Sequence, residues 1–303
     1  MREDLIHPFG DHAHWTEGFR FDFYDRARDL CGLMEIVLRP NTSTKEMFCH
    51  LMMPDGSVVG VRDSVPFDRP TLETKGLRFD MLGPEKRWEI GFIGGMDRTT
   101  ERKMKRSHVE LELEFDALSE VFDYRSCESW QGEHIPGRVA SEHLAQVGRL
   151  RGRLSTGLDE FEIDSLGERS HSWGVTDWAA PIGRTRLACQ FSETHALNVT
   201  RLATAEEIVE AGFVFQDGRN VPVIRTDLNV NADFSRNIKS FDMTLHDAEG
   251  NSHKVFGSIM KKVDVHHMSP DGKSMATVNE TLARYTIAGK NGYGIAEFLQ
   301  RTE

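Results

Sequence analysis

The sequence predicts a mainly β protein in which antiparallel strands form two packed barrel-like halves. Two stretches, "RFDFYD" (20–25) and "HVELELEF" (108–115), alternate in side-chain character with the period of two that is typical of strands with one buried face. Four further stretches place a glycine-containing turn between strand-like runs. The sequence has neither a repeated βαβ pattern nor a GxGxxG loop, so it gives no support to a dinucleotide-binding fold.

The glycine-containing turns predict hairpins, and one short segment predicts a helix. Asp-Gly favours a tight hairpin because both central residues of the preferred turn need positive φ. In "TAEEIVEAG", Thr204 can cap a helix, Glu207 can complete a capping box and Gly212 can end the helix, so we expect a helix over 204–211. The four expected hairpins are "LMMPDGSVVGV" (51–61), "FVFQDGRNVPVI" (213–224), "MTLHDAEGNSHKVF" (243–256) and "HHMSPDGKSMATV" (266–278).

A chain of 303 residues is long enough for two domains. We place the first at 1–165 and the second at 166–303, so that the second carries the "HSWG" sequence (171–174). No Pro/Ser-rich linker or charge block separates them, so we expect the halves to pack together.

Charge and hydropathy exclude several partners. The net charge of −11 would repel a nucleic-acid backbone or an anionic lipid surface. No segment approaches the ~20 apolar residues of a membrane span, and the first residues do not resemble a signal peptide, so we expect a cytoplasmic protein. The four scattered cysteines predict reduced thiols. The sequence leaves the oligomeric state open, with a homodimer as one option.

The stretch "GERSHSWGVTDW" (167–178) concentrates the chemistry of the chain. If it is extended, one face is bulky and polar and the other is mostly small. Burying such a polar face requires a partner for each group, so we expect it to line a cavity that holds water or ligand. The first face would carry Arg169, His171, Trp173, Val175 and Asp177, and the second Glu168, Ser170, Ser172, Gly174, Thr176 and Trp178.

This stretch resembles the signature G-x-R-D-H-S-W-G-x-R-D-W of the family that includes carotenoid 1,2-hydratases (hydroxyneurosporene synthase type) and AttH-like proteins. "SEHLAQVGRLRGRLSTGLDEFEI" (141–163) and "GYGIAEFL" (292–299) resemble other parts of the family. The resemblance implies two lipocalin-like antiparallel β-barrel domains, a hydrophobic cavity, and hydratase or cyclase chemistry without an organic cofactor. Ser170 and Thr176 depart from the signature, because many relatives carry Asp and Arg at these positions.

The signature residues suggest acid–base catalysis. An imidazole titrates near neutral pH, so His171 is the expected acid or base, and Asp177 is expected to orient it. Trp173 and Trp178 can bind an apolar or aromatic substrate. Arg169 can hold a substrate oxygen, and we add Glu168 beside it as a further substrate-binding candidate. The alternative is structural, with the same side chains forming a hydrogen-bonded brace.

Three residues outside the signature are additional substrate-binding candidates. Glu193 and His195 in "ETHALNVTR" resemble a cavity-facing strand of relatives, although an ordinary polar strand end would look the same. Glu297 in the last strand-like run can supply a second carboxylate. His12 and His14 would share a strand face, but no third ligand follows at a recognisable spacing, so we expect no metal.

These observations favour a cofactor-independent lyase-type enzyme. The expected reaction is hydration or dehydration, isomerisation, or C–C or C–O cleavage of a small hydrophobic isoprenoid or aromatic molecule by general acid–base catalysis. Two alternatives stay open: a non-catalytic lipocalin-like carrier of a hydrophobic ligand, and a protein in which the signature is only a brace.

Overall fold

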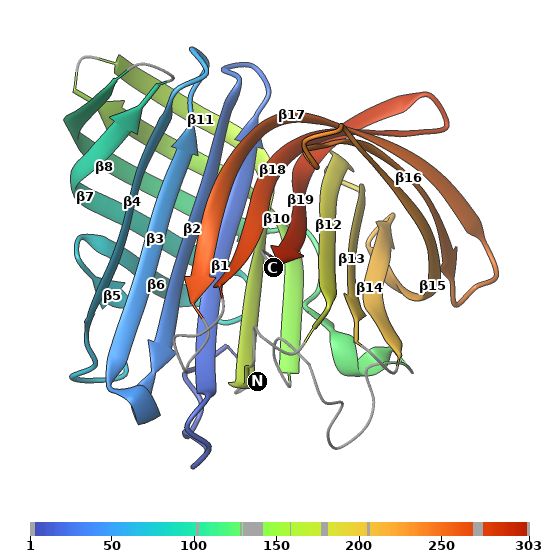
Figure 1. The fold of residues 1–303 in the computed structure, drawn as a ribbon, viewed down its shortest axis with the longest axis horizontal. Helices are drawn as coiled ribbons and strands as arrows, with labels where there is room; N and C mark the ends of the chain where they lie inside the picture. The colour runs from blue at the N-terminus through green and yellow to red at the C-terminus, as the bar shows by residue number, and fades with distance from the viewer. Residues whose placement is uncertain are drawn as a thin grey trace. The chain divides into compact units, whose positions relative to one another are not determined.

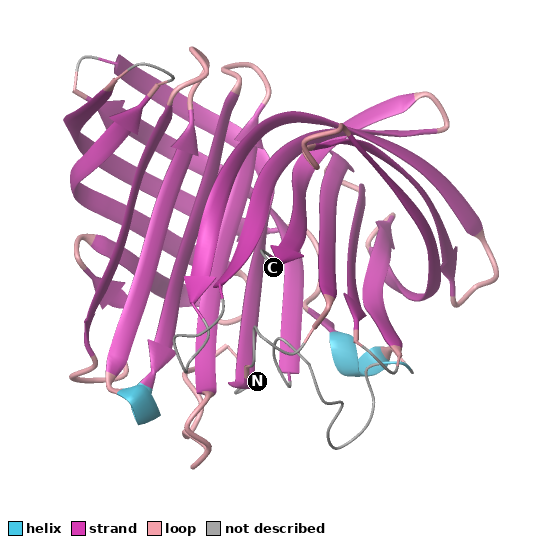
Figure 2. Ribbon diagram, in the orientation of Figure 1, coloured by secondary structure: helices cyan, strands magenta, loops and turns pink. Residues whose placement is uncertain are grey.

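The computed structural model describes residues 4–100, 103–127, 129, 142–157, 159–176, 181–204, 207–268 and 275–301, and these are almost entirely β-strand (Figure 2). The chain divides into two compact units. Unit 1 comprises Met1–Val121 and Ala140–Thr176, and unit 2 comprises Phe122–Val139 and Asp177–Glu303. The prediction of a mainly β, antiparallel protein is confirmed.

Unit 1 is built on one antiparallel sheet in the order β4-β3-β2-β1-β11-β10-β8-β7-β6-β5. A further pairing of β4 with β7 joins the sheet into a ring, coloured blue to yellow-green in Figure 1. Its strands are β1 (Trp15–Asp25), β2 (Leu30–Arg39), β3 (Thr44–Met52), β4 (Val58–Pro66), β5 (Glu73–Thr74), β6 (Leu77–Gly83), β7 (Arg87–Thr99), β8 (Met104–Ala117), β10 (Glu142–Thr156) and β11 (Asp159–Val175), with the 3-10 helix η1 (Pro40–Thr42).

Period-two alternation builds the interior of unit 1. On β8, Val109, Leu111, Leu113 and Phe115 are buried, while the glutamates between them are exposed or half-buried. Together with the phenylalanines of β1 they belong to one hydrophobic core cluster. The alternation in 108–115 therefore marks the inner face of a strand, as predicted.

Unit 2 contains a closed antiparallel barrel of β12 to β19 in sequence order. Its core includes Leu197, Phe241, Tyr285 and Phe298. The elements of this unit are β9 (Phe122–Asp123), η2 (Tyr124–Ser126), β12 (Gly183–Ser192), β13 (His195–Ala203), β14 (Ile208–Gln216), β15 (Arg219–Ala232), β16 (Ile238–Asp247), β17 (Ser252–Met268), β18 (Met275–Ile287) and β19 (Lys290–Arg301).

The expected hairpins are present. The turns in 51–61, 213–224 and 243–256 connect β3 to β4, β14 to β15 and β16 to β17, each an antiparallel pair. β17 also pairs with β18, but residues 269–274 of the fourth turn lie outside the described residues.

The predicted helix over 204–211 is wrong. Ile208–Gln216 is strand β14, and it pairs with β13 from Ile208 to Gln216. The backbone N–H of Glu207 does donate to Thr204 Oγ1, at 3.1 Å, but strand β14 begins at the next residue, Ile208. Pairing with β13 and burial of Val209, Phe213 and Phe215 outweigh a local capping signal of a few residues.

The division between the units also differs from the expected boundary at 165/166. Strand β11, which contains "HSWG", belongs to unit 1. It lies between β1 and β10 and pairs with both, with Phe19 opposite His171 on one side and Leu144 opposite His171 on the other. Local sequence could not reveal this, because the partner strand β1 is far away in the chain.

Among the described residues, no helix is long and apolar enough to cross a membrane.

Candidate functional site

The interior of unit 1 changes from apolar to polar along two paired strands. On β1, Phe23, Phe21 and Phe19 are core residues, and the next residue on the same face is Glu17. On β11, the residues on the corresponding face are Arg169, His171 and Trp173, which lie opposite Phe21, Phe19 and Glu17. The polar face predicted for the extended signature is therefore turned toward the core.

Glu17 is the centre of this polar region. Its Oε1 lies 2.8 Å from Nε2 of His171 and 2.7 Å from Nδ1 of His7. The backbone N–H of His7 also donates to the Glu17 carboxylate, at 3.0 Å to Oε2 and 3.1 Å to Oε1. We call these three side chains the Glu17 triad. The side chains of Glu17 and His171 are completely buried.

Aromatic rings fix both imidazoles of the triad. The His171 ring stacks on Phe19 at a centroid distance of 3.9 Å. The His7 ring stacks on Trp173 at 4.0 Å with an interplanar angle of 14°. The arrangement orients each imidazole toward the same carboxylate oxygen.

Burial makes Glu17 a proton-holding group near neutral pH. Removal from water raises the pKa of Glu17 to about 8, although the hydrogen bond from the His7 backbone acts in the opposite direction. Such a group can release or take up a proton near physiological pH.

Arg169 is held inside unit 1 by three partners. Its Nη2 lies 2.8 Å from Asp4 Oδ1, its Nε donates to Gln146 Oε1 at 2.6 Å, and its guanidinium lies 5.5 Å from the Trp88 ring centroid. Burial lowers the pKa of Arg169, and Asp4 opposes this effect. The contacts are those of a buried brace, which matches the structural alternative for this residue.

The other predicted site residues are dispersed. Asp177 and Trp178 lie outside the described residues. Glu168 is completely buried, but alternation along β11 turns it to the face opposite His171. Glu193 is exposed in the turn before β13, and His195 is half-buried against the Phe191 ring.

Glu297 is buried in unit 2, where it bridges two arginines. Its Oε2 lies 2.6 Å from Nη1 of Arg184, and its Oε1 lies 2.8 Å from Nη1 of Arg186. Its neighbours along β19, Ala296 and Phe298, belong to the barrel core, so Glu297 is on the opposite face of the strand.

Two histidine groups bear on metal binding. His12 and His14 lie in a turn before β1 rather than on a strand, and the His14 backbone N–H donates to His12 Nδ1. Among the described residues, His7, Glu17 and His171 bring three donor atoms within 4.8 Å of one another, which a metal ion could use. We interpret this group as a hydrogen-bonded triad, because one nitrogen of each imidazole, Nδ1 of His7 and Nε2 of His171, already lies at hydrogen-bond distance from Oε1 of Glu17.

Sequence reasoning missed Glu17 and His7. Glu17 did leave a signal, because it is an acidic residue in phase with Phe19, Phe21 and Phe23 on a buried strand face. His7 left none, since it precedes β1 in a segment without regular structure.

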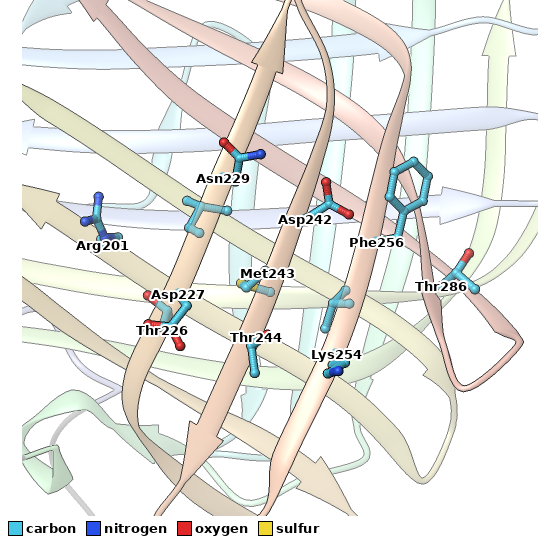
Figure 3. A pocket seen from close by; sticks show the side chains of 12 residues that line it. Arg201, Thr226, Asp227, Asn229, Asp242, Met243, Thr244, Lys254, Phe256 and Thr286 are labelled. Atoms are coloured by element: carbon cyan, nitrogen blue, oxygen red, sulfur yellow. The ribbon is translucent and has the colours of Figure 1, made fainter.

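A separate hollow of about 680 Å3 lies in unit 2 and contains none of the predicted site residues (Figure 3). It has an open, mixed lining with exposed Asp227, Asp242 and Phe256 beside buried Met243. The exposed Asp227 is itself bonded to Arg225 and His246. Its size alone does not make it the site, because it lacks a buried proton donor and acceptor pair among these residues.

Solved structures share the fold over almost the whole chain. A putative AttH protein (NE1406) from Nitrosomonas europaea aligns with a TM-score of 0.66 at 11% identity, covering 98% of this chain and 97% of that one. CghA with Sch210972 aligns at 0.62 and 10% identity, covering 98% and 94%. Kievitone hydratase from Nectria haematococca aligns at 0.56 and 9% identity, covering 100% and 92%.

These neighbours share the fold that the resemblance implies, and none of the three is named a carotenoid 1,2-hydratase. No curated protein sequence matches the chain. The model of one sequence family matches residues 2–302. The chain therefore belongs to that family, which is described as a domain of unknown function, DUF7064.

Proposed function

We propose that this protein is a cofactor-independent lyase-type enzyme that uses His171 and Glu17 for general acid–base catalysis. The observation that carries the proposal is the buried contact of 2.8 Å between His171 Nε2 and Glu17 Oε1. Glu17 thus occupies the orienting role that the sequence suggested for Asp177. A hydratase or dehydratase is the leading reaction class, with isomerisation and C–C or C–O cleavage as related options.

The pair has the chemistry that water addition and removal require. In the dehydration direction, an acid protonates the leaving hydroxyl, which departs as water, and a base removes a proton from the neighbouring carbon. The pair gives one proton to the leaving hydroxyl and receives one proton from the carbon, so it ends with the same number of protons as it began. The reaction therefore needs neither an oxidant nor a reductant. His171 is the group proposed to exchange protons with substrate, and Glu17 is proposed to hold or return the proton.

The aromatic surroundings support the proposed substrate class. Phe19, Trp173 and Trp88 lie around the polar end of the unit 1 interior. We propose a small hydrophobic isoprenoid or aromatic molecule, because such rings bind flat apolar groups and stabilise developing positive charge. One neighbour is named a hydratase, which supports the proposed reaction class. Carotenoids are a narrower possibility that the resemblance alone suggests.

The first experiment identifies the reaction. Native mass spectrometry of the purified protein should reveal a co-purified hydrophobic ligand, and that compound and its hydrated or dehydrated form are then incubated with the protein in heavy-oxygen water. We expect the hydration product to contain the heavy oxygen, at a rate that depends on His171 and Glu17. A ligand that binds and is recovered unchanged under all conditions would instead identify a carrier.

A further inference from the structure

The residues just before β1 form a strap across the polar end of unit 1. We define the strap as residues 4–9, which have no helical or strand structure. Ile6 packs against the core cluster. The ring centroid of Phe9 lies 5.3 Å from that of Trp15 and 5.6 Å from that of Phe67. The strap thus holds its place through side-chain contacts rather than through a strand ladder.

Asp4 anchors the first residue of the strap. One of its carboxylate oxygens lies 2.8 Å from Arg169 Nη2, and the other accepts the backbone N–H of Glu85. Arg169 is itself fixed by Gln146, whose amide donates to the carbonyls of Glu85 and Ser119 at 2.8 and 2.7 Å. Because both partners are almost completely buried, the Asp4–Arg169 pair is protected from screening by water and salt.

The strap lies between the catalytic pair and solvent. Glu17 and His171 have no exposed side-chain surface, whereas the His7 side chain is 20% exposed. The His7 ring fills the space against Trp173, and its backbone and ring both contact Glu17. Substrate cannot reach His171 in this arrangement unless the strap moves.

We propose that His7 is a positioning residue for Glu17, carried on a strap that Arg169 fastens through Asp4 and that opens to admit substrate. The catalytic meaning of this inference rests on the proposed function of His171 and Glu17. The signature arginine then acts at a distance: it binds the strap and not the substrate. Opening the strap gives substrate access, and closing it excludes water and restores the carboxylate–imidazole contacts.

Several charged groups share the inner face near Glu17 and belong to its electrostatic environment. These are His7 on the strap, Lys45 on β3, Glu142 opposite Trp173 on β10, and Arg169 and His171 on β11. Lys45 is held by Thr71 and by Asp68, 3.7 Å away. The contacts of Glu17 itself are with His7 and His171, so His7 is the group whose removal acts on it directly.

The strap can be tested without a substrate by chemical modification of imidazoles with diethyl pyrocarbonate. In the intact protein we expect slow modification of His171 and rapid modification of the exposed His108, mapped by mass spectrometry. Asp4→Asn should accelerate modification of His171 about tenfold or more, because the buried ion pair between Asp4 and Arg169 is lost. Phe9→Ala should do the same without disturbing Arg169. The control Asp11→Asn changes an exposed residue just beyond the strap and should leave the rate unchanged.

The positioning role has its own readout. Carbon-13 NMR of labelled glutamate carboxyls, with the Glu17 signal assigned by Glu17→Gln, reports the pKa of Glu17. We expect His7→Ala to lower that pKa from about 8 toward its ordinary value, because water enters the emptied space. His7→Asn, which refills part of that space and keeps water out of it, should restore part of the shift.

Two results would overturn the inference. One is an unchanged His171 modification rate in both Asp4→Asn and Phe9→Ala when each variant is folded by circular dichroism. The other is an unchanged Glu17 pKa in His7→Ala. Neither measurement involves turnover, so failure of the strap is distinguishable from failure of the proposed enzymatic function.

Discussion

Buried carboxylates have different hydrogen-bond and ion-pair partners in the two units. In unit 1, Glu17 contacts two imidazoles, whereas in unit 2 Glu297 bridges two guanidinium groups. Glu210, also in unit 2, is bonded to Arg201 and Thr226. An arginine stays protonated at any physiological pH, but an imidazole exchanges its proton near neutrality. The partners of Glu297 are therefore permanently charged, whereas the partners of Glu17 can themselves exchange a proton.

This difference places the proposed chemistry in unit 1. Two units of related architecture can use a buried acid either as a structural ion pair or as an acid–base group, and the residues that contact the acid determine its role. Glu297, a candidate from sequence, has the partners of a structural ion pair. Glu17, which sequence reasoning overlooked, has the partners of an acid–base group. Four experiments test the assignment of the chemistry to the Glu17 triad and the packing that builds it.

The largest expected effect is on turnover. Glu17→Gln and His171→Ala should each lower turnover of the identified substrate by about 10² to 10⁴, the usual contribution of general acid–base catalysis. Glu210→Gln, a matched change in unit 2, should retain turnover in its folded fraction. If His171→Ala keeps wild-type turnover, or if its loss follows the fraction unfolded with a destabilisation of about 1 to 3 kcal/mol, the triad is a brace.

The second effect is on the pH dependence of stability. Burial raises the pKa of Glu17 to about 8 from its ordinary value of 4.5, so the folded protein binds more protons than the unfolded chain between these values. This contribution to the free energy of unfolding is therefore present at low pH and is lost as the pH rises toward about 8. Over this pH range, the free energy of unfolding should fall by several kcal/mol in total.

Urea unfolding across this pH range measures the second effect. In Glu17→Gln, the free energy of unfolding should lose this part of its pH dependence, because the glutamine amide does not titrate. Equal slopes for wild type and Glu17→Gln would show that Glu17 is not the proton-holding group.

The third effect concerns the close approach of β11 to β1. A Cβ atom on Gly167 would lie 2.1 Å from the backbone oxygen of Asp22 and 2.6 Å from Leu150 Cδ1. Gly167→Ala should therefore lower the free energy of unfolding by about 2 to 4 kcal/mol, as overpacking against backbone does. Gly183→Ala in unit 2 is the control, since the nearest atom to its Cβ lies 4.0 Å away. A neutral Gly167→Ala would contradict the observed pairing of β1 with β11.

The smallest expected effect is from metal removal. We expect no stoichiometric zinc or iron in the purified protein, because the nitrogen and oxygen atoms of the Glu17 triad are engaged in hydrogen bonds with one another. Chelation should leave stability and turnover unchanged. Elemental analysis that finds about one tightly held metal ion per chain, lost together with activity on chelation, would reassign the triad as a metal centre.

Much of the fold could be predicted because its signals are local. Alternation in 108–115 and the turns in 51–61, 213–224 and 243–256 depend on neighbouring residues, and the structure contains the corresponding strands and hairpins. The helix over 204–211 failed because the capping signal of Thr204 and Glu207 was read without the strand that pairs with Ile208–Gln216.

The candidate site was only partly predictable. The signature drew attention to His171, whose catalytic role stays a prediction, and Arg169, His171 and Trp173 do share one face of β11. The partners of those residues come from distant parts of the chain: Glu17 is 154 positions from His171. Glu193, His195 and Glu297 belong to unit 2 and do not join this group.

The sequence by itself determined that the chain is rich in antiparallel strands, where most hairpins turn, and which stretch concentrates polar and aromatic side chains. Only the tertiary structure decided that β11 joins unit 1, that Glu17 faces His171, and that a strap carries His7 over both. The reason is physical. Periodicity and turn chemistry are encoded within a few residues, but strand pairing, burial and the protonation of a buried acid depend on which distant segments exclude water together.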